Sequence, residues 1–406
     1  MTRITILCLL VFAAYILPAQ DVGWRYDRTG IYTETGLMKS WPADGPELLW
    51  HFDELGQGHS SVSIDSDKMY VTGMTDTIGY LYVFDLQGNL LNKREYDEEW
   101  TESYPGSRGT VIPDEDRLYL VSGTGTLICF NESDLSVVWQ KSMSADFGGE
   151  VPRHGVNESP LILDEKLIFT PGGKEHNVVA LNKKTGELIW SSKVMGDVSS
   201  YCCPIYIDDQ QIPQVVTITG HHIVGLDISN GDMLWSVHFT NRFYEHPNTP
   251  VYGDGMILCT GSYGVGSVMI RLKDGGKAVE QVWSSVDLDS KSGHIVKIGD
   301  YAYGSGDYGK GSWYCVDWKT GEQLYKDRSI ATGAIIAAEG MLYCYSEKGD
   351  MALVRATPEK FDMISKFPIT LGTEQHYAHP VIYKGILYVR HGTSLMAYAI
   401  KEILED

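Results

Sequence analysis

The stretch NVVALNKKTGELIW, from Asn177 to Trp190, has the pattern of two short β-strands joined by a tight turn. Residues 178–181 (VVAL) form one apolar run, and residues 188–190 (LIW) form a second. Between them, the KKTG segment supplies turn residues, and Gly186 can take the positive φ angle that a hairpin turn requires. The stretch therefore predicts a β-hairpin.

Similar hairpins recur along the chain, with an apolar run, a turn and, in the stronger copies, a terminal aromatic residue. The copies are TLICFNESDLSVVW (126–139), HIVGLDISNGDMLW (222–235), VMIRLKDGGKAVEQVW (268–283) and SWYCVDWKTGEQLY (312–325), and weaker copies are YLYVFDLQGNLLNK (80–93) and MALVRATPEKFDMIS (351–365). From Trp139 to Tyr325 the terminal aromatic returns every 42 to 51 residues. Such a period, with all-β content, is typical of a propeller with four-stranded antiparallel blades. We expect the aromatics at this position to pack between adjacent blades; they are Trp139, Trp190, Trp235 and Trp283.

The two ends of the chain carry complementary parts of one further blade. Residues 47–50 (ELLW) resemble the last strand of a unit, but no strands of that unit precede them. Residues 379–400 contain three strands and lack a fourth. A closed ring leaves no free strand edge, so we expect the N-terminal strand to complete the last blade. Seven internal hairpins and this shared one predict an all-β, eight-bladed propeller at residues 47–400, with seven blades as the alternative.

The N-terminal segment has the features of a secretory signal peptide. Arg3 precedes an apolar run at residues 4–17, and Ala19 is the small residue before a cleavage site at Gln20. A membrane anchor is the alternative, but the apolar run is too short to span a bilayer. We expect a signal peptide at residues 1–19, an N-terminal arm at 20–46 and a C-terminal tail at 401–406. The mature chain would then be periplasmic or secreted, without a transmembrane segment.

Composition agrees with one large globular domain. The chain has 406 residues, 43% of them hydrophobic, and no low-complexity linker divides it. The formal net charge of −20 argues against nucleic acid or an anionic membrane surface as a partner.

The repeated hairpin resembles that of the quinoprotein-like propellers, whose repeats are described as pyrroloquinoline-quinone-binding-like. NVVALNKKTGELIW is similar to the family's "lyALdakTGkviW" repeat, and the likeness covers nearly the whole mature chain. TGLMKSWPADGPELLW (35–50) also looks like part of an exported bacterial subgroup. The resemblance implies the propeller fold. It implies two classes of function, quinone-dependent dehydrogenases and quinone-free proteins such as the propeller lipoprotein that helps assemble outer-membrane proteins, because fold does not settle function.

The adjacent pair Cys202 and Cys203 invites the dehydrogenase interpretation. Enzymes that this chain resembles often carry adjacent cysteines bridged over the quinone, in a site that also holds calcium. The alternative is that both are small residues in the first strand of the fourth blade, where a vicinal disulfide would disturb the ladder. The calcium-ligating carboxylate cluster that the resemblance implies is not recognisable in the sequence. Pyrroloquinoline quinone with calcium therefore stays a possible cofactor, and none is firmly implied.

A candidate binding site follows from propeller geometry. The innermost strand of each blade lines the central channel, so residues that lead into this strand lie at one mouth of the channel. Alignment of the units on their first strands places eleven residues there: His59, Arg108, His154, Asn157, Glu158, Tyr201, His246, Asn248, His294, Tyr377 and His379. Imidazoles together with Arg108 and Glu158 suit a small anionic or polar ligand, and a divalent metal is a further option. The alternative is that channel mouths are polar without binding anything.

The sequence thus predicts an exported propeller that acts as a non-catalytic scaffold for a small polar ligand or a protein partner. We expect a monomer with no resident metal. The alternative function is a quinone-dependent dehydrogenase of an alcohol or a sugar.

Overall fold

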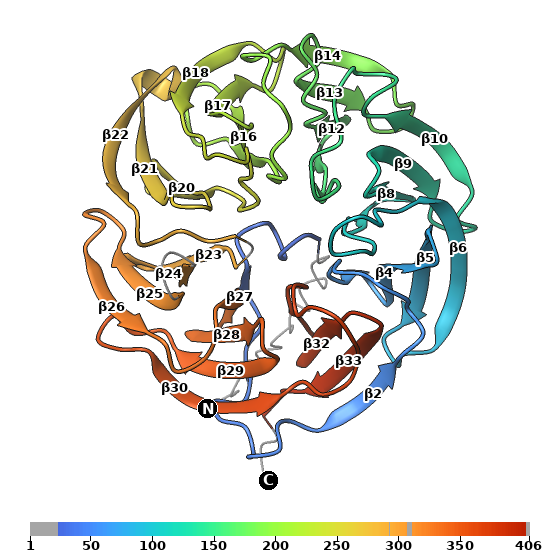
Figure 1. The fold of residues 1–406 in the computed structure, drawn as a ribbon, viewed down its shortest axis with the longest axis vertical. Helices are drawn as coiled ribbons and strands as arrows, with labels where there is room; N and C mark the ends of the chain where they lie inside the picture. The colour runs from blue at the N-terminus through green and yellow to red at the C-terminus, as the bar shows by residue number, and fades with distance from the viewer. Residues whose placement is uncertain (1–22, 292, 307–310, 403–406) are drawn as a thin grey trace, which may run out of the picture.

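The computed structural model describes residues 23–291, 293–306 and 311–402, and the predicted signal peptide lies outside these residues. The chain forms a ring of eight antiparallel sheets around a central channel (Figure 1). Within the described residues, the one helix is a single 3-10 turn, η1 (Asp274–Gly276). The prediction of an all-β, eight-bladed propeller is confirmed, and the seven-bladed alternative is wrong.

The first seven blades follow the chain in order, each with its first strand innermost and its fourth strand outermost. Blades 1 to 4 are β3 (Ser63–Asp65), β4 (Lys68–Thr75), β5 (Ile78–Asp85) and β6 (Leu90–Glu98); β7 (Ile112–Asp114), β8 (Arg117–Val121), β9 (Thr126–Asn131) and β10 (Val137–Ser142); β11 (Leu161–Leu163), β12 (Lys166–Phe169), β13 (Val178–Asn182) and β14 (Leu188–Ser192); β15 (Ile205–Ile207), β16 (Gln214–Ile218), β17 (His222–Asp227) and β18 (Met233–His238). Blades 5 to 7 are β19 (Val251–Gly253), β20 (Met256–Thr260), β21 (Ser267–Lys273) and β22 (Ala278–Ser285); β23 (Ile295–Ile298), β24 (Tyr301–Gly306), β25 (Ser312–Asp317) and β26 (Gln323–Asp327); β27 (Gly333–Ala338), β28 (Met341–Ser346), β29 (Asp350–Arg355) and β30 (Asp362–Pro368).

Blade 8 joins the two ends of the chain. Its first three strands are β31 (Val381–Tyr383), β32 (Ile386–His391) and β33 (Ser394–Ala399), and its outermost strand is β2 (Leu48–Phe52). The pairing of β2 with β33 is antiparallel, with Leu48 opposite Tyr398 and Trp50 opposite Ala397. Closure of the ring by the N-terminal strand, as predicted, is confirmed (Figure 1).

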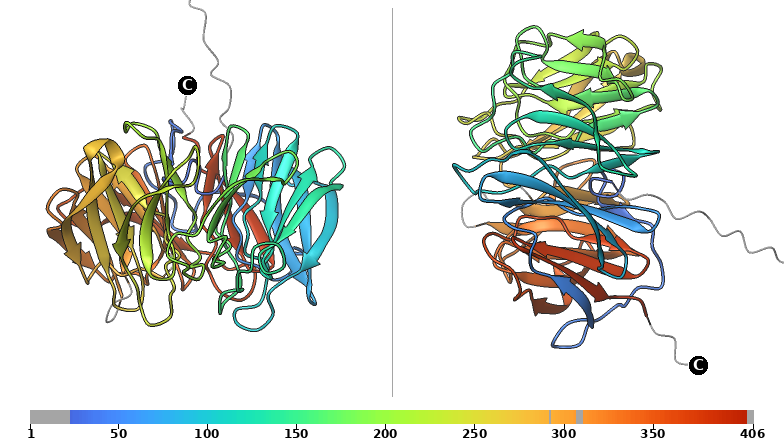
Figure 2. Two further views of the ribbon diagram at one scale, coloured as in Figure 1. Left: turned by 90° about the horizontal axis from the view of Figure 1, so that it is seen from above. Right: turned by 90° about the vertical axis from the view of Figure 1, so that its right-hand side faces the viewer.

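Blade 7 has a fifth strand that the sequence pattern did not indicate. β1 (Ile31–Tyr32), from the N-terminal arm, pairs in parallel with the innermost strand β27, with Ile31 opposite Ala337. The arm therefore lies inside the ring before the chain reaches β2 at the outer edge. Figures 1 and 2 show this arm, in dark blue, within the central opening of the ring.

A contact between a tryptophan of one blade and a turn glycine of the next explains why the hairpin pattern recurs. Trp139 of blade 2 donates a hydrogen bond from Nε1 to Lys183 O of blade 3 at 3.0 Å. Its ring lies against Gly186, which has a φ of +72° and where an added Cβ would be 2.8 Å from the indole. Gly186 is thus required both by the turn and by the ring that covers it. The same contact recurs at Trp50 with Gly88, Trp190 with Gly231, and Trp283 with Gly321.

Blade 5 departs from this arrangement because its hairpin is two residues longer. Trp235 packs in the core between blades 4 and 5, but its Nε1 donates to Gln214 Oε1 at 2.7 Å. Gly276 in the η1 turn faces the Gln214 amide instead of an indole ring. The longer turn is therefore accommodated by an intervening glutamine side chain.

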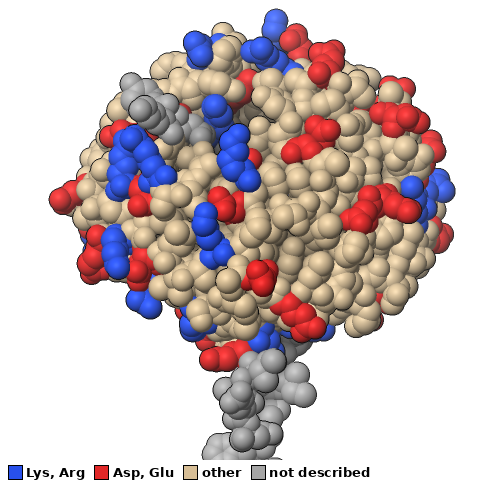
Figure 3. All heavy atoms as spheres, turned by 60° about the horizontal axis from the view of Figure 1, so that its bottom comes forward, with Lys and Arg blue, Asp and Glu red and all other residues tan. Residues whose placement is uncertain are grey.

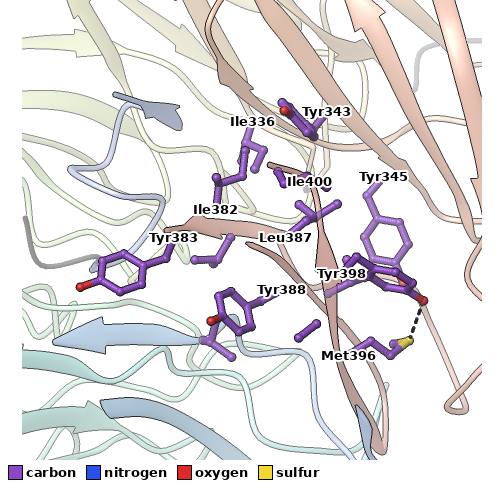
Figure 4. Close-up of a cluster of buried hydrophobic side chains, with 14 of the residues drawn as sticks. Ile336, Tyr343, Tyr345, Ile382, Tyr383, Leu387, Tyr388, Met396, Tyr398 and Ile400 are labelled. Atoms are coloured by element: carbon purple, nitrogen blue, oxygen red, sulfur yellow. Dashed lines mark hydrogen bonds between the residues drawn. The ribbon is translucent and has the colours of Figure 1, made fainter. Parts of the chain in front are cut away.

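The largest hydrophobic core of the described residues lies where the ring closes. It joins side chains of the arm with those of blades 1, 7 and 8. Figure 4 shows part of it, including Tyr388, Tyr398 and Leu387, with the Tyr398 hydroxyl 3.5 Å from the Met396 sulfur. Burial of many aliphatic and aromatic side chains stabilises the contact between the first and last parts of the chain.

On the outside, acidic and basic side chains are interspersed over the part of the surface that Figure 3 shows. No helix among the described residues is long and apolar enough to cross a membrane.

Candidate functional site

The N-terminal arm fills the central channel with two arginines. Arg25 donates to Ile295 O at 3.1 Å and to Ile335 O at 3.4 Å, on the innermost strands of blades 6 and 7. Arg28 reaches the opposite side, donating to Pro204 O at 2.9 Å and to Pro160 O at 2.6 Å. The two guanidinium groups therefore link four blades across the axis through backbone carbonyls.

The arm enters the channel from the face opposite the predicted site. Glu339, in the turn after β27, accepts hydrogen bonds from Gly36 N and Leu37 N. Glu34 accepts hydrogen bonds from Lys384 N and Gly385 N, in the turn after β31. These turns follow the innermost strands, whereas the predicted mouth precedes them. The channel is therefore closed from behind.

Trp24 forms the floor of what remains of the channel. Its indole makes edge contacts with the rings of His294 and His379, with centroids 5.5 and 5.2 Å apart. Its Nε1 donates to Thr249 Oγ1 at 3.3 Å. Above this floor lies a cavity of about 270 Å³, open at the predicted mouth. Its lining comprises Trp24, His59, Tyr104, Arg108, His154, Asn157, Tyr201, Cys203, Glu245, Pro247, Tyr263, Lys291, His294, Glu347, Tyr377 and His379.

Eight of the eleven predicted residues line this cavity: His59, Arg108, His154, Asn157, Tyr201, His294, Tyr377 and His379. The other three lie outside the lining. Glu158 accepts hydrogen bonds from Thr170 N, at 3.1 and 3.2 Å to its two oxygens. The His246 ring packs against Phe239, 5.0 Å between centroids. Asn248 donates to Ser290 O at 2.6 Å.

Arg108 holds the wall of the cavity in place. Its guanidinium donates to four backbone carbonyls, those of Ser103, Tyr104, Gly106 and His154, at 2.6–2.8 Å. These bonds use most of its donors, so Arg108 contributes positive charge to the cavity while its hydrogen bonds go to the protein.

Burial keeps two of the predicted histidines neutral. Burial, followed by the charges of Arg108 and Arg390, lowers the pKa of His59 to about 3. Burial also lowers the pKa of His246 to about 4. At neutral pH these imidazoles are therefore uncharged hydrogen-bonding groups.

The sequence did not reveal one carboxylate of the site, Glu245, or three of its aromatic side chains, Trp24, Tyr104 and Tyr263. Glu245 lines the cavity, whereas its neighbour His246, which the alignment favoured, does not. Trp24 comes from the arm, which has no counterpart in the repeat. Tyr104 and Tyr263 come from connecting loops outside the aligned segments. The one usable signal was the run of polar and aromatic residues before each first strand.

The backbone of the site is strained at four lining residues. Tyr104, Tyr201, Tyr263 and His294 have φ angles of 48°, 73°, 60° and 62°. Residues other than glycine rarely adopt this left-handed backbone conformation, and those that do are often found at ligand-binding sites. The same conformation also occurs in turns of the blades, for example at Glu115, Asp164 and Asp254.

Cys202 and Cys203 precede β15 instead of lying in it. A disulfide between them would therefore not disturb the hydrogen bonds of a β-ladder. In the structure both are free thiols with separate partners. Cys203 Sγ accepts a hydrogen bond from Ser159 N at 3.2 Å, and Cys202 Sγ lies 3.6 Å from Asn248 O. The vicinal disulfide is not present in this structure.

The donor groups at the cavity do not fit a calcium-bound quinone. Among the described residues, no three His, Cys, Asp or Glu side chains are grouped so that they could hold a metal. The two lining carboxylates, Glu245 and Glu347, therefore do not form the carboxylate cluster that the resemblance implies.

The fold and the site together define an eight-bladed propeller whose channel is closed by its own N-terminal arm. A sequence model described as outer membrane protein assembly factor BamB matches residues 41–174 and 136–360. The chain therefore belongs to this family of propellers with quinoprotein-like repeats.

Similar proteins and structures include a BamB and a quinohemoprotein alcohol dehydrogenase. An uncharacterised protein of Rickettsia conorii is 23% identical over 195 residues, 44% of this chain and 43% of that protein. BamB from Moraxella catarrhalis is 13% identical with a TM-score of 0.64, covering 87% of this chain and all of that one. Quinohemoprotein alcohol dehydrogenase from Comamonas testosteroni is 12% identical with a TM-score of 0.69, covering 97% of this chain and 82% of that one. At these identities the structures support the fold alone.

Proposed function

We propose that this chain is an exported, non-catalytic binding scaffold of the cell envelope. The observation that carries the proposal is the arm, because Trp24 and Arg25 convert an open channel into a pocket with a built floor. The pocket would take a small polar ligand, and a protein partner would dock on the surrounding surface. Membership of the BamB family supports a scaffold role and a monomer in the envelope.

The competing function is a quinone-dependent dehydrogenase of an alcohol or a sugar. Its support is the likeness of fold to the Comamonas enzyme over nearly the whole chain. The free thiols and the dispersed carboxylates argue against it.

One experiment, on the protein without residues 1–19, distinguishes the binding scaffold from the dehydrogenase. The purified protein is mixed with pyrroloquinoline quinone and calcium, and thermal stability, quinone absorbance and dye-linked alcohol and sugar oxidation are measured. We expect no dye reduction and no calcium-dependent change in quinone absorbance. Dye reduction that requires both additions, and that Cys202→Ser weakens, would establish the dehydrogenase instead.

A further inference from the structure

The channel concentrates positive charge on the axis of an acidic protein. Three arginines lie in the channel or at its mouth and donate to backbone carbonyls; they are Arg25, Arg28 and Arg108. Among the described residues, the arginines that form ion pairs are different ones, Arg117, Arg271 and Arg355. The three axial charges therefore form no ion pair with a carboxylate of the described residues, although the whole chain carries −20.

The rim of the pocket adds further cations, each held over an aromatic ring. Arg242 and Arg153 lie 4.5 and 5.3 Å from the centre of the Phe243 ring. Lys291 lies 5.6 Å from the centre of the Tyr263 ring, and the Phe243 and Tyr263 rings contact each other. These cations outnumber the two lining carboxylates, Glu245 and Glu347, and an excess of positive charge around a concave site attracts a ligand of negative charge.

One wall of the pocket presents the buried carboxylate of Glu245, which lies beside His154 and Tyr263. Glu245 is 6% exposed, and its backbone carbonyl is fixed by Asn241 Nδ2 at 2.6 Å and Ser262 Oγ at 2.8 Å. Its carboxylate forms a side-chain hydrogen bond with Tyr263, and its buried Oε1 lies 3.4 Å from His154 Nε2, which leaves acceptor capacity on Oε1. Buried carboxylate oxygens are normally hydrogen-bonded, so this one is suited to a donor from a ligand.

We propose that the pocket binds a hydroxylated organic acid, such as a sugar acid or a hydroxy acid. Lys291 and the axial arginines attract its carboxylate, and Glu245 Oε1 accepts a hydrogen bond from one of its hydroxyl groups. The Trp24 and Tyr201 rings pack against its carbon skeleton. The cavity of about 270 Å³ suits a molecule of one sugar ring. The inference rests on the proposed binding role of the pocket.

Glucuronate is the probe, because it carries both groups in one ring. Isothermal titration at about 20 mM salt compares it with glucose, which lacks the carboxylate, and with acetate, which lacks the hydroxyls. We expect glucuronate to bind at least about tenfold more tightly than either, and more weakly at about 200 mM salt because screening reduces the charge attraction. Equal binding of glucose or of acetate, or no binding of glucuronate at millimolar concentration, would overturn the proposal.

Two variants test which side chains bind the carboxylate and the hydroxyl groups of glucuronate. Lys291→Gln removes an exposed cation at the rim, and Glu245→Gln replaces the charged acceptor with a neutral one of the same shape. Each should weaken glucuronate binding about tenfold, since hydrogen bonds to charged groups are the stronger kind. Arg271→Gln, on the outer surface, is the matched control and should leave binding unchanged. Unchanged affinity in both pocket variants, with a folded far-ultraviolet spectrum, would refute the assignment. Quinone-dependent oxidation would refute the scaffold function while leaving glucuronate binding intact, so the two failures can be told apart.

Discussion

The outer ring and the central channel of this propeller are held together by different interactions. In the ring, one contact recurs: a tryptophan of one blade covers a turn glycine of the next. In the channel, single-copy side chains of the arm donate to backbone carbonyls of several blades. The comparison shows that the repeat builds a stable ring, whereas residues outside the repeat give this ring its pocket.

Loss of one repeated contact should have the largest effect on stability. Trp190→Ala removes a side chain that is 7% exposed, together with its hydrogen bond to Ile228 O at 3.0 Å. We expect the free energy of unfolding to fall by about 3–5 kcal/mol, the usual range for a buried aromatic. Leu188→Ala on the same strand is the control, because Leu188 is 48% exposed. Similar urea midpoints for the two variants would contradict the role of the tryptophan.

Loss of an axial contact should have the next largest effect. Arg25→Met keeps a long side chain but leaves the carbonyls of Ile295 and Ile335 without this donor. We expect a loss of about 2–4 kcal/mol, since buried unpaired polar groups destabilise by roughly 1–3 kcal/mol each. Arg271→Met, which breaks an exposed ion pair, should cost less than about 1 kcal/mol. Urea unfolding of both variants measures the difference, and equal values would show that the arm adds no stability.

Alanine substitutions at two glycines with similar backbone angles distinguish the stability lost through turn geometry from the stability lost through tryptophan packing. Gly231 and Gly255 have φ angles of +78° and +70°, but an added Cβ at Gly231 would lie 2.5 Å from Trp190 while Gly255 has open space. Alanine should cost about 1–2 kcal/mol at Gly255 from backbone strain alone. At Gly231 we expect about 1 kcal/mol more, since the indole must move. Thermal unfolding of both variants tests this, and equal losses would exclude a steric role for the tryptophan.

The smallest effect concerns the pH dependence of stability, through the buried carboxyl group of Glu158. Burial raises the pKa of Glu158 to about 8, so the folded chain holds this proton more tightly than the unfolded chain. The stabilisation from the protonated group is present below about pH 4.5 and is lost as the pH rises to about 8. Glu158→Gln should therefore gain thermal stability relative to the parent over this window, by a few degrees. The exposed control Glu280→Gln should show no such gain. A difference between parent and Glu158→Gln that does not change with pH would contradict the shift.

The ring was predictable because its determinants repeat. Seven hairpins, five of them with a terminal aromatic, indicated the blades, and the isolated strand at residues 47–50 indicated how the ring closes. Tertiary structure then confirmed both, in the order of the eight sheets and in the pairing of β2 with β33.

The site was predictable in position but not in composition. Alignment placed His246 at the mouth, yet its neighbour Glu245 lines the pocket and His246 packs against Phe239. Which of two adjacent side chains faces a cavity depends on local φ and ψ angles. Here Tyr201, Tyr263 and His294 adopt left-handed conformations that no periodicity of the sequence reveals.

The sequence by itself determined the hairpins of the blades and the closing strand, because these depend on local turn chemistry and on a spacing that recurs, and it favoured eight blades over seven. Tertiary structure alone decided that the arm would close the channel and that Trp24 would become the floor of a pocket. The physical reason is that Arg25 and Arg28 bind backbone carbonyls, which every residue offers, so their partners become defined when the folded ring brings those carbonyls to the axis.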